Sequence, residues 1–239
     1  MAHFLLIHGS WHGGWCWERL SAILQARGHE VWAPTLAGLA ERADEASPQT
    51  GLATHMEQTT NLIEAADQKD LVLVGHSYGG LVLAATAERV PDYIGHLVFL
   101  DAFVPEHGQS AFDLMPGAES GFVQMMRDSG SDFLVPPLSP EDMGVTEPAD
   151  VEWVRTRLTP MPILTHREKV EAPQRRAFQI PATYIYCLQF ELGAGFAAQA
   201  RRHGWQVLEA DTRHDVMVTH PDLLADLLEQ IPLLGSGRR

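Results

Sequence analysis

One serine in a glycine-bounded pentapeptide is well suited to nucleophilic chemistry. Ser77 lies in GHSYG (residues 75–79), after the apolar run Leu71–Val74 and before a Leu- and Ala-rich series at 81–85. Where a strand turns abruptly into a helix, such a serine is held in a strained backbone conformation and its hydroxyl is presented beyond the sheet edge. The helix N-terminus then directs free N–H groups at negative charge beside the serine. The pattern predicts a nucleophilic serine at a strand-to-helix turn.

A serine hydroxyl needs a base to take its proton, and a third group must orient that base. Of the 12 histidines, His214 lies in a loop directly after the last predicted strand (205–209) and before the closing helix (221–230). In one known chain order of catalytic triads the base follows the nucleophile at this point. His220 directly precedes Pro221 and is better explained as the start of the helix. We therefore predict His214 as the base.

Two backbone N–H groups are expected to stabilise the oxyanion that forms when a serine attacks a carbonyl carbon. One is the amide of Tyr78, directly after the nucleophile. The other is expected from Ser10, in a glycine-rich loop after the first predicted strand. We expect Gly13 and Gly14 to let this loop fold back over the nucleophile.

Six short apolar runs alternate with helix-compatible segments, and these elements must position the reactive residues. The runs are Phe4–Ile7, Val31–Pro34, Leu71–Val74, His96–Leu100, Tyr184–Cys187 and Trp205–Glu209. The helix after the fifth run is expected over about 195–202. This alternation predicts one α/β domain over residues 1–239, with a parallel sheet covered by helices on both faces.

The alternation lapses between about residues 103 and 180, where repeated prolines break the chain into short pieces. A structureless loop of that length would be unusual in a compact domain. We therefore expect a helical cap over about 103–180, inserted into a core formed by 1–102 and 181–239.

Composition restricts the partners. The formal net charge of −14 argues against nucleic acid or an anionic membrane surface, since both attract clustered Lys and Arg. Cys16 and Cys187 lack metal or redox spacing, and no apolar run is long enough to span a bilayer. We expect a cytoplasmic protein with reduced thiols, without a metal or cofactor, that acts on a small molecule. Its oligomeric state stays open between a monomer and a homodimer.

Four motifs together resemble the α/β-hydrolases of the hydroxynitrile lyase and methylesterase group, which includes plant methyl salicylate esterases and small bacterial esterases. They are HGSWHGGWCW (8–17), GHSYGG (75–80), VFLDAFVP (98–105) and His214. The similarity spans nearly the whole predicted core and is weak across the predicted cap. It implies serine esterase chemistry without a cofactor, with Ser77 as nucleophile and His214 as base. It also implies that the amides of Ser10 and Tyr78 form the oxyanion hole.

The chain departs from this group at the acid of the triad. The group has an Asp shortly after the fifth strand, and Phe190 stands at that position here. Glu191 is adjacent, but a shift of one residue turns a strand side chain to the opposite face. Asp101 ends the fourth strand, on the sheet edge where the His214 loop is expected. We favour Asp101, while Glu191, a Ser-His dyad or another carboxylate such as Asp211 or Asp215 remain alternatives.

The substrate pocket is expected to be apolar. Four large side chains flank the predicted catalytic loops, namely Trp11, Phe103, Phe190 and Met217. The predicted cap adds Phe112, Met115, Phe122, Met125 and Met126. Around a capped serine, these side chains indicate a small hydrophobic or aromatic ester.

Three other functions occur on this fold. A hydroxynitrile lyase resembling this chain would use a lysine after the catalytic histidine and a hydroxyl residue before Ser10, where this chain has Asp215 and Gly9. Cofactor-independent dioxygenases resemble the chain in taking an acid from the fourth strand, as Asp101 would be. A non-catalytic ligand receptor can also retain the triad. The favoured prediction is a serine carboxylesterase with Ser77, His214 and Asp101 as triad.

Overall fold

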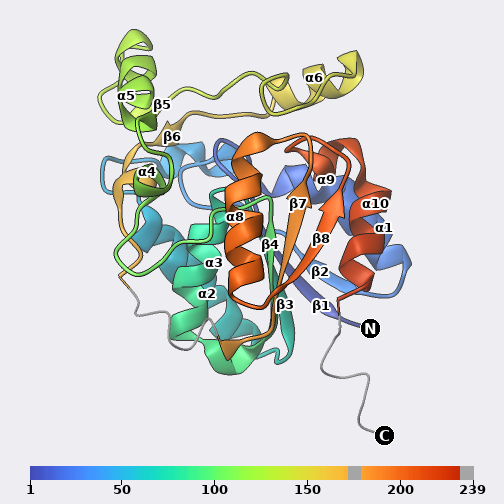
Figure 1. Cartoon of the computed structure of the whole chain (residues 1–239). Coiled ribbons are helices and arrows are strands. Elements are labelled where there is room, and N and C mark those ends of the chain that lie inside the picture. Colours follow the sequence, from blue (N-terminus) through green and yellow to red (C-terminus); the bar gives the residue numbers. More distant parts are fainter. Residues whose placement is uncertain (172–178, 232–239) are drawn as a thin grey trace, which may run out of the picture.

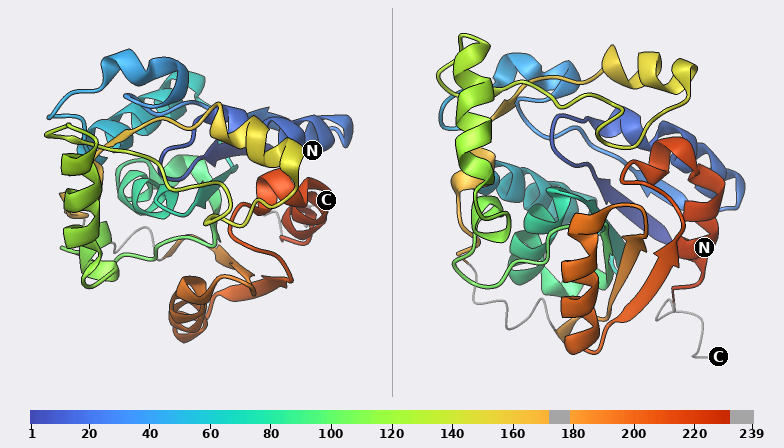
Figure 2. Two further views of the ribbon diagram at one scale, coloured as in Figure 1. Left: turned by 90° about the horizontal axis from the view of Figure 1, so that it is seen from above. Right: turned by 45° about the horizontal axis from the view of Figure 1, so that its top comes forward.

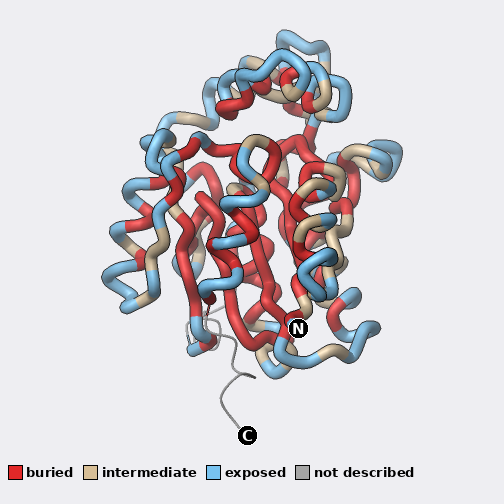
Figure 3. Tube along the Cα trace, turned by 90° about the vertical axis from the view of Figure 1, so that its right-hand side faces the viewer, coloured by how far each residue is buried: buried red, intermediate tan, exposed pale blue. Residues whose placement is uncertain are grey.

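A computed structural model describes residues 1–171 and 179–231. Its centre is a six-stranded sheet in the order β2-β1-β3-β4-β7-β8, with every neighbouring pair parallel. The strands are β1 (His3–Ile7), β2 (Glu30–Trp32), β3 (Leu71–His76), β4 (Ile94–Leu100), β7 (Ala182–Cys187) and β8 (Gln206–Ala210). All residues of β3 and β4 are buried, because helices cover both faces of the sheet (Figure 3). The predicted six-stranded parallel sheet is confirmed.

Five helices of eight or more residues accompany this sheet. They are α1 (Glu18–Ala26), α2 (Leu52–Ala66), α3 (Gly79–Arg89), α8 (Glu191–Arg202) and α10 (Pro221–Glu229). α1 packs on α10, α2 on α3, and α8 on β7 and β8 (Figure 1). Shorter turns are the 3-10 helices η1 (Gly14–Trp17), η2 (Ala40–Glu45) and η3 (Pro91–Tyr93) and the helix α9 (Val216–Thr219). Within 1–171 and 179–231, no helix has the length and apolar character needed to cross a membrane.

A long insert separates β4 from β7 and lies over the carboxyl edge of the sheet (Figure 2). Its elements are α4 (Ala111–Leu114), α5 (Ala118–Asp128), β5 (Leu134–Val135), α6 (Pro148–Arg155), β6 (Met161–Pro162) and α7 (Leu164–Arg167). β5 and β6 pair antiparallel and hold the insert's two halves together. Residues 172–178 of the predicted cap lie outside the described part of the chain. We refer to residues 103–180 as the insert.

Candidate active site

Ser77 lies between the end of β3 and the start of α3, in a turn that leaves no room for side chains on its flanks. Its φ is 54°, in the left-handed region that costs energy for a residue other than glycine. A Cβ atom on Gly75 would lie 2.6 Å from the carbonyl oxygen of Gly79, and one on Gly79 would lie 2.7 Å from that of Ile7. The backbone N–H of Ser77 donates to Leu100 at 3.2 Å, which ties the turn to the end of β4. The glycines therefore permit the strained turn.

The imidazole of His214 is held by the carboxylate of Asp101. Nδ1 of His214 donates to Oδ2 of Asp101 at 2.7 Å, and the backbone N–H of Cys187 reaches Oδ1 at 3.4 Å. Because a carboxylate only accepts, Nδ1 carries the proton and Nε2 is left to accept one. Asp101 is only 4% exposed, and burial raises its pKa despite the opposing effect of the hydrogen bond from His214.

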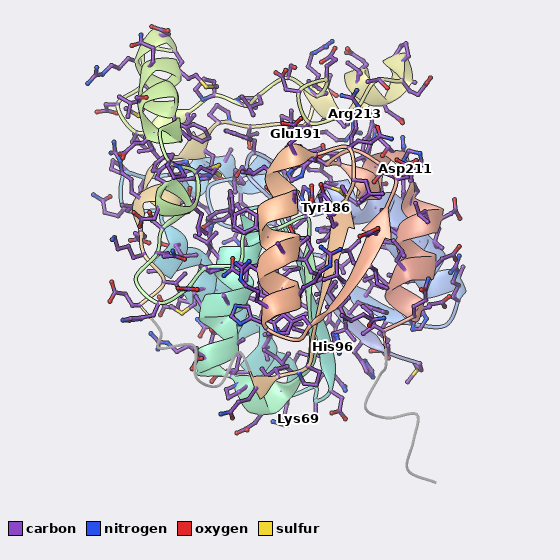
Figure 4. All side chains as sticks on the ribbon, viewed as in Figure 1. Lys69, His96, Tyr186, Glu191, Asp211 and Arg213 are labelled. Atoms are coloured by element: carbon purple, nitrogen blue, oxygen red, sulfur yellow. The ribbon has the colours of Figure 1, made fainter. Side chains whose placement is uncertain are left out.

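The other candidate acids lie elsewhere. Glu191 is exposed at the first residue of α8, and Asp211 is exposed and accepts from Gln189 at 3.0 Å (Figure 4). Asp215 is fully buried but pairs with His12. Of the carboxylates considered from the sequence, the structure brings Asp101 into hydrogen-bond contact with the His214 ring.

Two rings flank His214. The Phe190 ring stacks on it with centroids 4.2 Å apart and planes 27° apart, and the His76 ring lies 4.4 Å away. Burial, together with repulsion from His214, lowers the pKa of His76 well below its usual value, so His76 is neutral. Phe190 thus occupies the position expected for the acid and shields one face of the His214 ring.

The loop after β1 passes directly beside Ser77. A Cβ atom on Gly9 would lie 2.9 Å from Cβ of Ser77, so only glycine fits at this close approach. Tyr78, whose amide is the second predicted oxyanion donor, follows Ser77 at the start of α3. Its ring is buried, and its hydroxyl lies 2.9 Å from Nδ1 of His55. Both predicted oxyanion residues therefore adjoin the Ser77 turn.

The insert anchors the side chain of Ser10 through His166. The Thr165 hydroxyl donates to the carbonyl of Pro162 at 2.7 Å and therefore accepts from Nδ1 of His166 at 3.0 Å. Nε2 of His166 is then an acceptor for the Ser10 hydroxyl at 3.2 Å. Burial lowers the pKa of His166 to about 3, so this ring is neutral. The side chain of Ser10, which belongs to the core, is consequently hydrogen-bonded to the insert.

A largely apolar cavity opens at Ser77, with an empty volume of about 820 Å³ including its open mouth. Core residues that line it are Ser10, Trp11, His12, His76, Ser77, Asp101, Phe190, Leu192, Gly193, Phe196 and His214. The insert contributes Phe103, Met115, Phe122, Leu138, Asp142, Met143 and His166. The cavity lining thus includes Trp11, Phe103 and Phe190, which we predicted for the substrate pocket.

Several predicted pocket residues lie outside this cavity. Met217 is fully buried in α9 and does not line it. Phe112 packs behind the lining ring of Phe122, with centroids 5.4 Å apart. Met125 and Met126 lie on α5 and also do not line it. Leu192, Phe196 and His166, which do line it, had no signal in the sequence beyond their apolar or aromatic character.

In the described part of the chain, one set of side chains is grouped closely enough to bind a metal ion. His76, His214 and Asp215 each have a ligand atom within 4.8 Å of the others. Three of their six side-chain nitrogen and oxygen atoms already have hydrogen-bond partners: Nδ1 of His214 binds Asp101, Nε2 of His76 lies 3.2 Å from the His214 carbonyl, and Oδ2 of Asp215 binds His12. These contacts account for the group as a network within the protein.

The chain is similar to known esterases along most of its length. The sequence pattern described as "Alpha/beta hydrolase family" matches residues 4–227. A carbendazim hydrolyzing esterase from Nocardioides sp. (strain SG-4G) is 35% identical over 248 residues, covering 95% of this chain and 98% of that protein. Methylesterase 1 of Arabidopsis thaliana is 43% identical over 114 residues, covering 45% of this chain and 43% of that protein.

A solved structure agrees with these sequence relatives. An extracellular α/β-hydrolase from a Paenibacillus species, described as sharing structural and functional homology with tobacco salicylic acid binding protein 2, superposes with a TM-score of 0.84 at 27% identity. The match covers 96% of this chain and 98% of that one. The predicted resemblance to methylesterase-like hydrolases and the prediction of an esterase are therefore confirmed. The chain belongs to the α/β-hydrolase family.

Proposed function

We propose that this chain is a serine carboxylesterase in which Ser77 attacks the ester, His214 transfers the proton and Asp101 orients His214. The observation that carries this proposal is the hydrogen bond of 2.7 Å from His214 to Asp101, at the wall of a cavity that Ser77 also lines. It leaves Nε2 of His214, which lines the same cavity, as an acceptor. The insert would serve as the cap that closes the cavity.

The proposal assigns a residue to each step of the reaction. Nε2 of His214 takes the Ser77 proton as Oγ bonds to the ester carbon, and the carbonyl electrons become an oxyanion. The amides of Ser10 and Tyr78 would donate to that oxyanion, an interaction of several kcal/mol for this kind of site. Collapse expels the alcohol, which takes the proton from His214, and leaves an acyl-serine. Water, deprotonated by His214, then releases the acid and restores Ser77.

The cavity favours small aromatic esters or carbamates. Trp11 and Phe122 lie 5.7 Å apart and form an aromatic wall, and Phe103 and Phe196 are 5.5 Å apart on another side. Flat apolar groups fit such surfaces. The relative that matches this chain over most of its length is named for hydrolysing carbendazim, a methyl carbamate of a flat bicyclic amine. We propose that methyl esters and methyl carbamates of aromatic groups are substrates.

Each alternative function has a different signature. For a hydroxynitrile lyase, the residue after the base would be a lysine, whereas Asp215 is buried and paired with His12 here. Asp101 on β4 is compatible with a cofactor-independent dioxygenase, and a receptor would bind aromatic ligands without turnover. The esterase is favoured because the relatives are named esterases.

The proposal is tested with p-nitrophenyl esters of increasing acyl length, methyl salicylate and carbendazim, assayed with wild type and Ser77→Ala. We expect hydrolysis with the wild type, none with the variant, and a mass increase equal to the acyl group on the peptide containing Ser77. Activity that survives Ser77→Ala would overturn the proposal. Benzaldehyde release from mandelonitrile, or oxygen consumption with a hydroxyquinolone, would support the respective alternative.

We further propose a cytoplasmic location and no nucleic acid or membrane partner. Cys16 and Cys187 are buried free thiols, as expected of a reducing compartment. The net charge of −14 disfavours polyanionic partners. The choice between monomer and homodimer stays a prediction that light scattering can test.

A further inference from the structure

A buried pair of charged side chains, His12 and Asp215, adjoins the proposed site, and His12 lines its cavity. Nε2 of His12 and Oδ2 of Asp215 are 3.1 Å apart, and the two residues are 1% and 0% exposed. Nδ1 of His12 lies 2.7 Å from the carbonyl oxygen of Ser10. Because that carbonyl only accepts, Nδ1 carries a proton, and an ionised Asp215 requires a second proton on Nε2. His12 can therefore bridge the two acceptors.

The pair is charged despite its burial. Burial opposes charge on both groups, but their mutual attraction and hydrogen bond raise the pKa of His12 and lower the pKa of Asp215. The remaining oxygen of Asp215, Oδ1, is buried without a hydrogen-bond partner and lies 3.9 Å from Nε2 of His76. Replacing both members of a buried ion pair by well-packed apolar residues is often neutral or stabilising, so stability alone does not explain why this pair is present.

The His12–Asp215 bridge connects the loop that carries Ser10 to the loop that carries His214. His12 is two residues beyond Ser10 on the oxyanion loop, while Asp215 directly follows His214. The backbone N–H of Asp215 also donates to the carbonyl of Met143 in the insert, at 3.1 Å. His76, next to Ser77, donates from Nε2 to the His214 carbonyl at 3.2 Å. The oxyanion loop, the nucleophile turn and the base loop are thus linked by buried side-chain hydrogen bonds.

We propose that the His12–Asp215 ion pair fixes the oxyanion loop relative to the His214 loop, so that Asp215 is a positioning residue for hydrolysis. This inference rests on the proposed serine esterase function. Asp215 does not line the cavity, so its effect on the reaction must pass through His12 and His214. Removing its carboxylate should leave substrate binding intact and weaken the interactions made with the oxyanion.

The measurement compares two inhibitors that occupy the same pocket. The Ser77 hydroxyl oxygen adds to the carbonyl carbon of an aryl trifluoromethyl ketone, and the carbonyl oxygen becomes an oxyanion. The matched methyl ketone binds largely without this addition. The ratio of their inhibition constants therefore reports on the oxyanion hole, independently of ground-state binding. It is determined for Asp215→Leu, Asp215→Asn and the control Asp211→Leu, which removes an exposed carboxylate from the same loop. Assays are run well below the melting temperature of each variant.

Asp215→Leu should lower kcat about 100-fold with KM changed less than about threefold, since losing one oxyanion donor costs about 100- to 1,000-fold. The inhibitor ratio should fall by a similar factor. Asp215→Asn, whose amide can still donate to Nε2 of a neutral His12, should recover most of both losses, and Asp211→Leu should match the wild type. If Asp215→Leu does not fold, Asp215→Ser, whose side chain is too short to reach His12, replaces it with the same expectation.

An unchanged inhibitor ratio in Asp215→Leu would overturn the positioning role, whatever happens to its melting temperature. A loss that appears in KM rather than in kcat would also overturn it. Ser77→Ala is assayed in parallel. If hydrolysis by the wild type does not depend on Ser77, the proposed function itself fails; if it does and the ratio is unchanged, only the present inference fails.

Discussion

Replacing Asp101 by Asn changes one atom of the side chain and should disable the base. Oδ1 of Asp101 accepts from the backbone N–H of Cys187, while Oδ2 accepts from Nδ1 of His214. In Asp101→Asn, the amide oxygen is favoured beside the Cys187 N–H, because an NH2 group there would place two donors face to face. The NH2 group then faces Nδ1 of His214. The imidazole must accept at Nδ1 and carry its proton on Nε2, where it cannot take the proton of Ser77.

The size of the effect follows from losing the correct tautomer and the charge together. In serine hydrolases an Asp to Asn change in the triad lowers kcat about 10⁴-fold, or about 5 kcal/mol. Stability should move in the opposite direction. Burial raises the pKa of Asp101, which means that the folded state disfavours its ionised form. A neutral Asn removes that cost, so the melting temperature at neutral pH should be equal or higher.

The assay is hydrolysis of p-nitrophenyl acetate by wild type, Asp101→Asn and Glu191→Gln, with melting temperatures measured for all three. Glu191→Gln is the matched control, because Glu191 is exposed at the start of α8. Its kcat should stay within about twofold of the wild type, as for most surface changes away from a site. The reasoning is refuted if Asp101→Asn retains more than about a tenth of kcat, or if Glu191→Gln loses as much.

Two further predictions concern residues that pack around Asp101 and His214, and a third concerns three buried histidines. Gly193→Ala should lower kcat about tenfold or more, since a methyl group there would press on Oδ1 of Asp101 and lie 2.9 Å from the Tyr186 ring. Gly195→Ala on the same helix, with nothing within 4 Å, should not change kcat, and equal losses would contradict the explanation. Phe190→Leu removes the ring stacked on His214 and should lower kcat/KM about two- to fivefold, because an aromatic face stabilises the imidazolium formed during the reaction by about 0.5–1 kcal/mol; an unchanged kcat/KM would argue against this. Burial lowers the pKa of His8, His55 and His166 to about 3, about 4 and about 3, from 6.5. As pH falls from 6.5 toward 4, the unfolded chain takes up protons that the folded chain cannot. Each of these histidines should then cost about 1.4 kcal/mol of stability per pH unit, measured by urea unfolding, with a shallower slope in His55→Gln.

The Ser77 turn could be predicted because part of its constraint is local. A Cβ atom on Gly75 would collide with Gly79, four residues on, whereas one on Gly79 would collide with Ile7 of the neighbouring β1; both leave the same glycine spacing in the sequence. The placement of Asp101 followed from topology instead. β3 and β4 are parallel neighbours with His76 opposite Leu100, so the residues that follow them emerge at one edge of the sheet.

The pocket was harder to predict because its walls depend on tertiary packing. Met217 lies close to His214 in sequence, but its side chain on α9 points into the core. The helix expected to start near residue 195 begins at Glu191. Its first turn was not predicted because Gly193 and Gly195 are weak helix formers. His166 comes from a proline-broken insert without periodicity, so no pattern indicated its contact with Ser10.

Three residues together explain how the carboxylate can come from β4 rather than from the segment after β7. Leu100 of β4 pairs with Ile185 of β7, and the N–H of Asp101 donates to Ile185 at 2.7 Å, so the two strand ends lie side by side. The residues that follow β4 and β7 therefore emerge next to each other at this edge of the sheet.

With Asp101 as the proposed acid, the position after β7 needs no carboxylate, and it holds Phe190, which stacks on His214. Asp101 in turn requires a neighbour without a side chain, which Gly193 provides on α8. Gly193 lies in the first turn of α8, and glycine favours a helix less than alanine does, by up to about 1 kcal/mol. That cost is understandable if the space beside the carboxylate matters more than the stability of the helix. Asp101, Phe190 and Gly193 are thus best regarded as one arrangement, in which changing any one of them alone disturbs how His214 is held.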